Sequence, residues 1–319
     1  MSDYFFEVLR PGINTTFQDK GRFHMQHLGV APGGCMDLKS FLIANALVGN
    51  SSEEGVLEFA YQGPLLKLIK GGTKIAITGN VLFQIIKSDQ KVLDGECNRT
   101  YYLDEGDKID ILATKKSAYG YMSIEGGFDI KPFCKSISIL SRAQIGPNEG
   151  KKININDEIK VKLISKNKKN FSTKILKKNR NEIRVLKGSQ FNYFSEESRK
   201  DFFSKEYKIS NLTDRMGMRL EGVSMKNIVD TNIRSEGITK GAIQVPADGQ
   251  PIILLTDYPT IGGYPKIANV TSVDYNLLIQ KTPGEKISFE LIKLRDAEQL
   301  YKEHLNSISE VIKNIKEIN

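Results

Sequence analysis

A polar Gly-Asp turn leads into a strand of alternating apolar residues in the stretch Leu103-Asp104-Glu105-Gly106-Asp107-Lys108-Ile109-Asp110-Ile111. The same arrangement recurs near the other end of the chain, in Thr282-Pro283-Gly284-Glu285-Lys286-Ile287-Ser288-Phe289. A weaker third copy, which lacks the glycine, is Ile155-Asn156-Asp157-Glu158-Ile159. Gly and Asp tolerate the backbone angles of tight turns, so these segments predict β-hairpins. One strong copy near each end favours two β-rich halves of related design.

The rest of the chain predicts more strands and only a few helices. Short apolar runs separated by glycine indicate strands at residues 65–69, 74–78, 82–86, 108–112 and 119–124. Asp37 and Ser195 are placed to cap short helices over residues 38–48 and 196–203. Residues 295–318 carry apolar side chains at helical spacing and predict an amphipathic tail helix. We expect this helix to pack on its own body, and binding to a partner is the alternative.

The length of 319 residues exceeds one average domain, so we predict two halves with a connection between them. The parts are an N-terminal half (1–165), a lysine-rich linker (166–184), a C-terminal half (185–294) and the tail helix (295–319). The chain's excess of basic residues is concentrated in the linker, but Phe171 is the lone aromatic residue there. A stacking platform for bases is therefore absent there, and we expect no nucleic-acid partner despite the net charge of +8.

Composition excludes several classes of protein. With 39% hydrophobic and 26% charged residues, the chain is typical of a globular protein. No apolar run could span a membrane and the start does not resemble a secretion signal, so we expect a cytoplasmic protein without membrane contact. The three cysteines are widely spaced and exclude a disulfide framework or a Cys-x-x-Cys site. Only three histidines occur, so we predict no metal centre.

General catalytic motifs are missing from the sequence. It has no Gly-x-Ser-x-Gly elbow, Walker A loop, Gly-x-Gly-x-x-Gly fingerprint or His-Glu-x-x-His helix. A nucleophilic pair of Cys35 and His27 is conceivable, but a cysteine in a glycine-rich turn is more often only a small residue. Polar residues instead gather beside glycines at residues 18–37, 213–222 and 235–266. There, side chains and backbone N–H groups can converge on a carboxylate, amide or phosphate, or the same groups can brace the turns.

These clusters contain strings that closely resemble one family. They are Gln18-Asp19-x-Gly21-Arg22, Gly29-Val30 to Met36-Asp37, Ala44-Asn45-x-Leu47-Val48-Gly49-Asn50, Asp214-Arg215-Met216-Gly217-x-Arg219-Leu220-Glu221-Gly222 and Gly241-Ala242-Ile243-Gln244-Val245-Pro246-x-Asp248-Gly249-Gln250-Pro251. The family is the carboxyltransferase subdomain family, once described as the second component of allophanate hydrolase. It includes the C subunit of prokaryotic 5-oxoprolinase, the KipI antagonist KipA and the equivalent region of urea carboxylase. The strings occur in order and the resemblance covers roughly residues 8–291.

The resemblance implies a mostly β fold of two cyclophilin-like β-barrel halves, with a few short helices and a C-terminal helix. It implies a role as the C subunit of a hydrolase that opens 5-oxo-L-proline, a cyclic amide, to L-glutamate with ATP. The implied partners are a KipI-like subunit and a LamB/YcsF-like subunit, and no cofactor is bound covalently to this chain. Two alternatives stay open. One is a component of a biotin-dependent, urea carboxylase-like carboxyltransferase, in which a partner carries the carboxybiotin, and the other is a non-catalytic regulator that binds a KipI-like protein.

Such a reaction needs cations for developing negative charge and carboxylate or amide groups to hold the substrate. We assign the catalytic role to Asp214, Arg215, Gln244, Asp248, Gln250 and Lys266. Substrate binding is assigned to Gln18, Asp19, Arg22, Gly262, Gly263 and Tyr264. We expect Arg215 and Lys266 to be exposed cations in a cleft, and the bracing of turns is the alternative for the whole set.

Two segments depart from the family's usual pattern. Many members read Asp-Arg-Gln-Thr-Thr-Gly-Gly-Tyr-Pro-Lys where this chain has Asp257-Tyr258-Pro259-Thr260-Ile261-Gly262-Gly263-Tyr264-Pro265-Lys266. The glycine-rich stretch after Ser141-Arg142 is also shortened. If the replaced side chains touch substrate in relatives, the substrate here is in doubt, whereas if they only shape the loop, Pro259 supplies rigidity instead.

Overall fold

The computed structural model forms two compact units and describes residues 4–162, 165, 167–175, 180–230 and 232–318. Unit 1 consists of Met1–Arg22, Gly33–Leu176 and Ser307–Asn319, and unit 2 of Phe23–Pro32 and Lys177–Asn306. Unit 2 thus takes in a short segment that the sequence placed in the N-terminal half. The predicted mostly β fold with few helices is confirmed. No helix among the described residues is long and apolar enough to cross a membrane.

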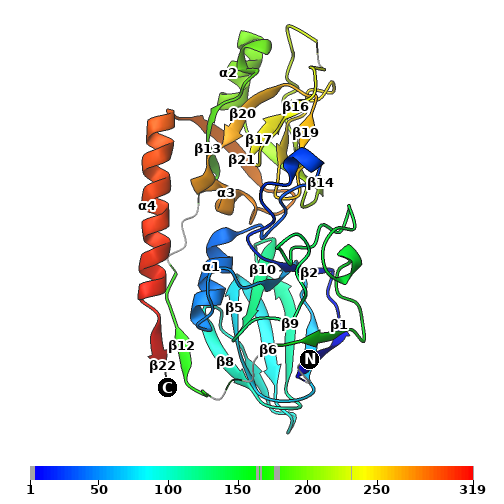
Figure 1. Cartoon of the computed structure of the whole chain (residues 1–319). Coiled ribbons are helices and arrows are strands. Elements are labelled where there is room, and N and C mark those ends of the chain that lie inside the picture. Colours follow the sequence, from blue (N-terminus) through cyan, green and yellow to red (C-terminus); the bar gives the residue numbers. More distant parts are fainter. Residues whose placement is uncertain (1–3, 163–164, 166, 176–179, 231, 319) are drawn as a thin grey trace. The chain divides into compact units, whose positions relative to one another are not determined.

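Unit 1 is built from two antiparallel sheets (Figure 1). Its strands are β1 (Phe5–Arg10), β2 (Asn14–Gln18), β3 (Val56–Ala60), β4 (Leu65–Leu68), β5 (Thr73–Gly79), β6 (Val81–Ile86), β7 (Val92–Asp94), β8 (Arg99–Leu103), β9 (Lys108–Thr114), β10 (Tyr119–Ile124), β11 (Glu158–Lys160), β12 (Asn170–Ser172) and β22 (Lys316–Ile318). The six-stranded sheet has the order β11-β1-β4-β9-β6-β7, and the seven-stranded sheet has the order β2-β3-β10-β5-β8-β12-β22. The strands predicted between residues 65 and 124 are all present.

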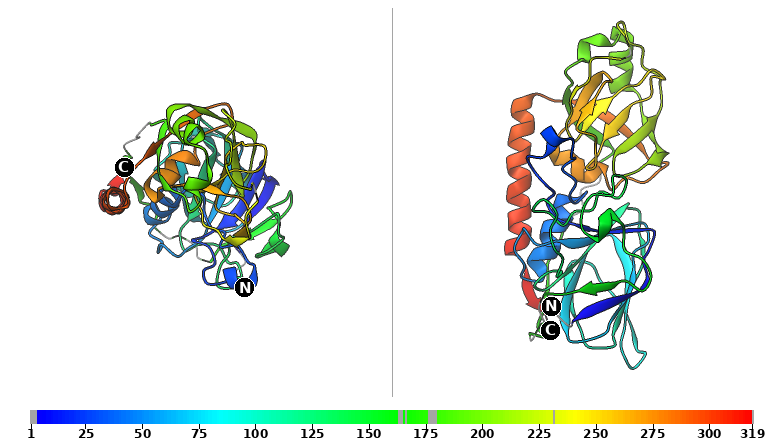
Figure 2. Two further views of the ribbon diagram at one scale, coloured as in Figure 1. Left: turned by 90° about the horizontal axis from the view of Figure 1, so that it is seen from above. Right: turned by 45° about the vertical axis from the view of Figure 1, so that its right-hand side comes forward.

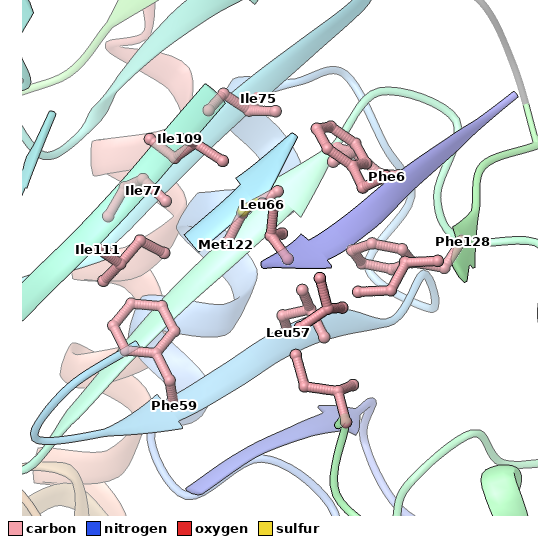
Figure 3. Packing of buried hydrophobic residues seen from close by; sticks show 14 of the residues in the cluster. Phe6, Leu57, Phe59, Leu66, Ile75, Ile77, Ile109, Ile111, Met122 and Phe128 are labelled. Carbon is pink, nitrogen blue, oxygen red and sulfur yellow. The ribbon is translucent and has the colours of Figure 1, made fainter. Parts of the chain in front are cut away.

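One hydrophobic core lies between the two sheets of unit 1 (Figure 3). In β9, Ile109 and Ile111 are fully buried while Asp110 between them is partly exposed, because alternate strand residues point to opposite faces. Ile75 and Ile77 of β5 meet them from the other sheet, and Figure 3 shows these four side chains close together. Each such side chain contributes about 1.5–3 kcal/mol relative to exposure.

Helix α1 (Leu38–Leu47) begins as predicted. The Asp37 carboxylate accepts hydrogen bonds from the Ser40 backbone N–H (3.1 Å) and from its hydroxyl (2.7 Å), which satisfies donors that the first helical turn leaves free. Gly49, with a φ of +79°, follows the last turn. A left-handed glycine at this position ends helices readily because it has no Cβ.

Unit 2 holds a closed seven-stranded barrel (Figure 2). Its strands are β13 (Glu182–Lys187), β14 (Tyr207–Thr213), β15 (Gly217–Glu221), β17 (Ala242–Gln244), β18 (Ile252–Leu254), β20 (Lys266–Val270) and β21 (Lys286–Leu291). The barrel order is β13-β20-β17-β18-β15-β14-β21, and a parallel pairing of β13 with β21 closes it. A separate two-stranded antiparallel sheet, the β16–β19 sheet, is formed by β16 (Glu236–Gly237) and β19 (Ile261–Gly262).

Two short helices belong to unit 2, α2 (Glu196–Ser204) and α3 (Ser272–Leu278). The predicted cap of α2 is confirmed, because the Ser195 hydroxyl accepts a hydrogen bond from the Ser198 backbone N–H (3.1 Å). Phe202 of α2 stacks on Phe289 of β21 with ring centroids 4.5 Å apart. This contact fixes the helix on the barrel.

The Gly-Asp turns are present, but the hairpins predicted from them are wrong. Gly106 adopts a left-handed φ of +85° between β8 and β9, and these strands belong to the two different sheets of unit 1. Asp107 is fully buried and accepts hydrogen bonds from the backbone N–H groups of Ser88 (2.9 Å) and Asp104 (2.8 Å). The turn is thereby tied to the loop after β6 instead of joining neighbouring strands. Gly284 similarly leads from α3 into β21, not from strand to strand.

The tail helix α4 (Leu294–Lys313) is followed by the strand β22, so it ends before the predicted residue 318. The chain becomes extended there because β22 pairs with β12. Near this end Val311, Ile312 and Ile315 pack against Ile43 and Leu47 of α1, and the expected packing of the tail on its own body is confirmed. The predicted lysine-rich linker contains β12 and the start of β13, while Lys166, Lys177 and Lys178 lie outside the described residues.

Candidate functional site: the Lys266 cluster of unit 2

The neighbouring strands β17 and β20 place a lysine and a glutamine side by side. Gln244 and Lys266 are direct register partners, and partners across a ladder project from the same face. Both side chains belong to almost fully buried residues, with 5% and 4% of their surface exposed. Ile243, the neighbour of Gln244, is fully buried on the opposite face of the strand. The sequence thus puts two polar groups on a covered face, where each needs a partner.

Gln190 and Glu236 complete this group, which we call the Lys266 cluster (Gln190, Glu236, Gln244 and Lys266). The ammonium of Lys266 forms an ion pair with Glu236 Oε1. The same oxygen accepts a hydrogen bond from Gln190 Nε2 (3.0 Å), and Gln190 Oε1 accepts one from the Lys266 backbone N–H (3.2 Å). The Lys266 ammonium, followed by the Gln190 amide, lowers the pKa of Glu236 below its ordinary value. Glu236 is therefore ionised at neutral pH.

The β16–β19 sheet covers Gln244. A Cβ added to Gly262 would lie 2.6 Å from Gln244 Nε2, so the glycine leaves the space that this amide occupies. Gln244 Nε2 is buried and has no hydrogen-bond partner among the residues that the structure describes. A buried amide donor without a partner lowers the stability of the fold. It also marks a place where the amide N–H can donate a hydrogen bond to an oxygen of a ligand. Gly263 and Tyr264 continue the same loop, with Tyr264 40% exposed.

The Lys266 cluster combines one ammonium, two primary amides and one partly exposed carboxylate. An ammonium in a place sheltered from water stabilises negative charge on an oxygen strongly, and a free amide N–H can hold a carbonyl or carboxylate oxygen. This set suits one small anionic or amide group. Glu236 and Gln190 were not among the predicted site residues. Glu236 stands beside Gly237 in the glycine-rich stretch, which is a usable signal, whereas Gln190 carries no local signal.

Arg215 and Asp214 lie at a turn of the barrel, and their side chains make hydrogen bonds that stabilise this turn. The Arg215 guanidinium makes two hydrogen bonds to Asp257, from Nε (2.8 Å) and from Nη2 (2.9 Å). Asp214 accepts bonds from the backbone N–H groups of Met216 (2.8 Å) and Gly217 (3.1 Å). The expectation that Arg215 and Lys266 are exposed is wrong, because only 8% and 4% of their surface is accessible. Each is covered because its charge is matched by a carboxylate, Asp257 or Glu236.

Asp248 and Gln250 occupy another turn of unit 2. Asp248 pairs with Arg219 and accepts a hydrogen bond from the Gln250 backbone N–H (3.1 Å). The Gln250 side chain exchanges two hydrogen bonds with the backbone of Gly222 (2.9 and 3.2 Å). These contacts connect the loop after β17 with the end of β15. They give both residues a bracing role, and their assigned catalytic role stays a prediction.

The residues predicted in the first half gather in unit 1, around residues 136–139. Both carboxylate oxygens of Asp19 are occupied, by the backbone N–H groups of Gly21 (2.8 Å) and Ile137 (2.7 Å) and by the hydroxyls of Ser136 and Ser138 (2.7 and 2.6 Å). Gln18 and Arg22 donate to the backbone carbonyls of Ile139 and Ser138. These three residues organise one loop of unit 1, and their predicted contact with substrate remains untested.

Tyr258 shows how the altered loop is accommodated. It stands where the family pattern given above predicts arginine, and it packs with Ile238, Ala242 and Leu254 in a small apolar cluster. Burial raises the pKa of Tyr258, and the Gln26 side chain hydrogen-bonds with its hydroxyl and opposes that rise. The replacement thus serves packing within unit 2.

The comparison with known families decides the identity of the fold. The family described as the carboxyltransferase domain, subdomain A and B, matches residues 28–291. The chain belongs to this family. As a carboxyltransferase-domain protein it has relatives of two kinds, and the predicted resemblance is confirmed.

Relatives of the first kind match this carboxyltransferase-domain chain from end to end. The C subunit of 5-oxoprolinase from Haemophilus influenzae is 29% identical over 98% of this chain and 99% of that protein. The corresponding protein of Escherichia coli is 30% identical over 94% of this chain and 97% of its own length.

Relatives of the second kind are much longer than this chain. The urea amidolyase of Kluyveromyces lactis superposes with a TM-score of 0.87 at 27% identity, over 96% of this chain and 20% of that one. The urea carboxylase of the same yeast gives a TM-score of 0.86 over 29% of its length. The chain therefore spans less than a third of these enzymes.

Proposed function

We propose that this chain is the C subunit of a 5-oxoprolinase-type complex, which opens the ring amide of 5-oxo-L-proline to give L-glutamate at the expense of ATP. The observation that carries this proposal is the end-to-end similarity to two proteins named as the C subunit of 5-oxoprolinase, which covers 99% and 97% of their lengths. Similarity to the urea amidolyase of Lachancea kluyveri covers only 17% of that protein. The similarity thus extends over nearly the whole of the two subunit relatives and over a small part of the long enzyme.

The Lys266 cluster is the part of the chain that we assign to this reaction. Lactams resist hydrolysis because their amide is resonance-stabilised, and phosphorylation of the lactam oxygen by ATP makes that oxygen a leaving group. Lys266 is suited to stabilise the negative charge that develops, and the unpartnered Gln244 amide is suited to hold the substrate's oxygen.

Partner chains complete the proposed enzyme. One ammonium and two amides match a single small group better than a triphosphate, so we assign ATP binding to the partners. These are a KipI-like subunit and a LamB/YcsF-like subunit. The carboxylate of Glu236 already neutralises Lys266 in the chain alone, which is consistent with a site that is completed only on assembly.

Carboxyl transfer is the second candidate function. It is favoured by the TM-scores of 0.87 and 0.86 with urea amidolyase and urea carboxylase. In that reaction a partner would carry carboxybiotin, and urea or another amide would accept the carboxyl group. The Lys266 cluster also suits carboxyl transfer, because the amide that accepts the carboxyl group must be held by its oxygen.

Reconstitution separates these functions. The purified chain is mixed with the KipI-like and LamB/YcsF-like subunits, ATP and 5-oxo-L-proline, and glutamate and ADP are measured. We expect both products, and we expect Lys266→Met in this chain to remove them while the matched control Lys286→Met, on an exposed ion pair, does not. Consumption of urea that depends on carboxybiotin, with no glutamate formed, would establish the second function. Tight binding to the KipI-like subunit without either reaction would establish a regulatory role.

A further inference from the structure

We propose that Glu236 occupies, in the free chain, the position that an anionic oxygen of the substrate takes at Lys266, and that substrate binding displaces it. The ammonium of Lys266 faces one carboxylate oxygen, Glu236 Oε1, and Gln190 Nε2 donates to the same oxygen (3.0 Å). An ammonium and an amide N–H that converge on one oxygen are the contacts expected for a bound carboxylate. The inference rests on the proposed function, since it says how the Lys266 cluster takes up its ligand.

Glu236 differs from the rest of the Lys266 cluster in its exposure. Its side chain is 43% exposed, whereas Gln190, Gln244 and Lys266 are all at least nine-tenths buried. A carboxylate at this boundary regains water when it leaves, but the ammonium left behind cannot, because its surroundings are closed. The buried lysine therefore requires a replacement anion, and this requirement makes the exchange selective for negatively charged ligands.

The element that carries Glu236 is short. The ladder of β16 and β19 consists of two residue pairs, Glu236 with Gly262 and Gly237 with Ile261, and one backbone hydrogen bond flanks it on each side, from Ile233 to Gly263 (2.8 Å) and from Ile238 to Thr260 (3.4 Å). Glu236, Gly237 and Ile261 are exposed, and Ile238 is the buried residue that follows them. Because the Glu236 side chain stands at the surface, a local change in this short segment can move its carboxylate away from Lys266 while Gly262 stays against Gln244.

Acetate, the smallest carboxylate probe, tests the inference on the chain alone by calorimetric titration. Glu236→Gln keeps the shape of the side chain and removes its charge, so we expect acetate to bind about ten-fold or more tightly than to the unaltered chain. The double variant Glu236→Gln/Lys266→Met is expected to lose this gain. Glu206→Gln is the matched control, because Glu206 forms an exposed ion pair with Lys286 in the same unit, and it should leave acetate binding unchanged.

A folded Glu236→Gln variant that binds acetate no better than the unaltered chain would overturn the inference. In that case Lys266 would have become neutral by losing its proton, and no anion would need to bind to it. Should this variant not fold, Glu236→Asp serves, because its shorter side chain withdraws the carboxylate, and equal binding in both proteins would again refute the exchange. Acetate binding requires no turnover. A gain in binding together with full activity of Lys266→Met in the complex would keep this inference and refute the site proposed for the reaction.

Discussion

Lys266 carries a buried charge, whereas its partner Glu236 lies at the surface. This difference in exposure determines how replacement of Lys266 affects stability. Lys266→Met removes the charge and keeps most of the apolar stem, while Glu236 can be solvated. We expect the melting temperature to change little and turnover of the assembled complex to fall by about 10²-fold or more, the effect of losing one preorganised electrostatic group. Thermal melting and turnover per complex, measured beside Lys286→Met, check this. A lower melting temperature with unchanged turnover would make Lys266 a structural residue.

Arg215 is expected to behave in the opposite way. Its guanidinium and the Asp257 carboxylate are both about nine-tenths buried, with 9% and 10% of their side chains exposed. Arg215→Ala removes the guanidinium that is paired with this buried carboxylate, and breaking such a buried pair costs about 3–5 kcal/mol in the free energy of unfolding. Denaturant titration should show this loss and a partial recovery in Arg215→Ala/Asp257→Ala. The half-exposed pair of Arg219 and Asp248 is the control, and Arg219→Ala should cost about 1 kcal/mol or less.

Single residues were predictable from the sequence where their role is local. Asp37 and Ser195 cap the helices that follow them, because a cap depends on residues only a few positions away. The residues that form the Lys266 cluster were harder to predict from the sequence. Gln190 meets Glu236 and Lys266 only because β13 and β20 are neighbours in the barrel, and no pattern around Gln190 records that pairing.

At the scale of elements, the β16–β19 sheet covers Gln244 closely because Gly262 has no side chain. In Gly262→Ala the new Cβ would lie 2.6 Å from Gln244 Nε2, and the end of the glutamine must move because it is the flexible partner. We expect a folded protein with turnover reduced about ten-fold or more, since small displacements of positioned groups are costly in rate. Gly237→Ala in the same two-stranded sheet is the control, as its Cβ would meet no atom within 4 Å. Equal turnover in both variants would remove Gln244 from the site.

The elements themselves follow the sequence closely, but their connections do not. Alternating apolar residues predicted β9, because burial of one strand face dictates that pattern, and a short apolar run predicted β10, which is buried at every position. The turn before β9 was also predicted, yet it joins the two sheets of unit 1 instead of forming a hairpin. A turn sequence fixes local backbone angles, and the partner of the next strand is decided by distant residues.

At the scale of the whole molecule, the second candidate function, in which a partner carries carboxybiotin, raises the question of whether this chain itself carries biotin. Carrier domains present the modified lysine in a Met-Lys-Met hairpin, and the nearest match here is Ser224-Met225-Lys226-Asn227. Met225 is buried, and the Lys226 backbone N–H donates to the Ser198 hydroxyl (2.8 Å), so the segment is bound to the start of α2 and is not a projecting tip. Intact mass of the expressed protein should show no biotin. A stoichiometric adduct on Lys226 would contradict this.

Catalysis should require assembly. In the free chain Glu236 neutralises Lys266, Arg215 pairs with Asp257 and Asp19 is fully engaged in one loop of unit 1, so the predicted charged groups are bound to protein groups instead of presented to a substrate. The purified chain is therefore expected neither to hydrolyse ATP nor to release glutamate from 5-oxo-L-proline, whereas addition of the KipI-like and LamB/YcsF-like subunits should produce both activities. Coupled ADP and glutamate assays on the chain, on each pair of proteins and on the full mixture measure this directly. Robust turnover by the lone chain would refute the dependence on partners.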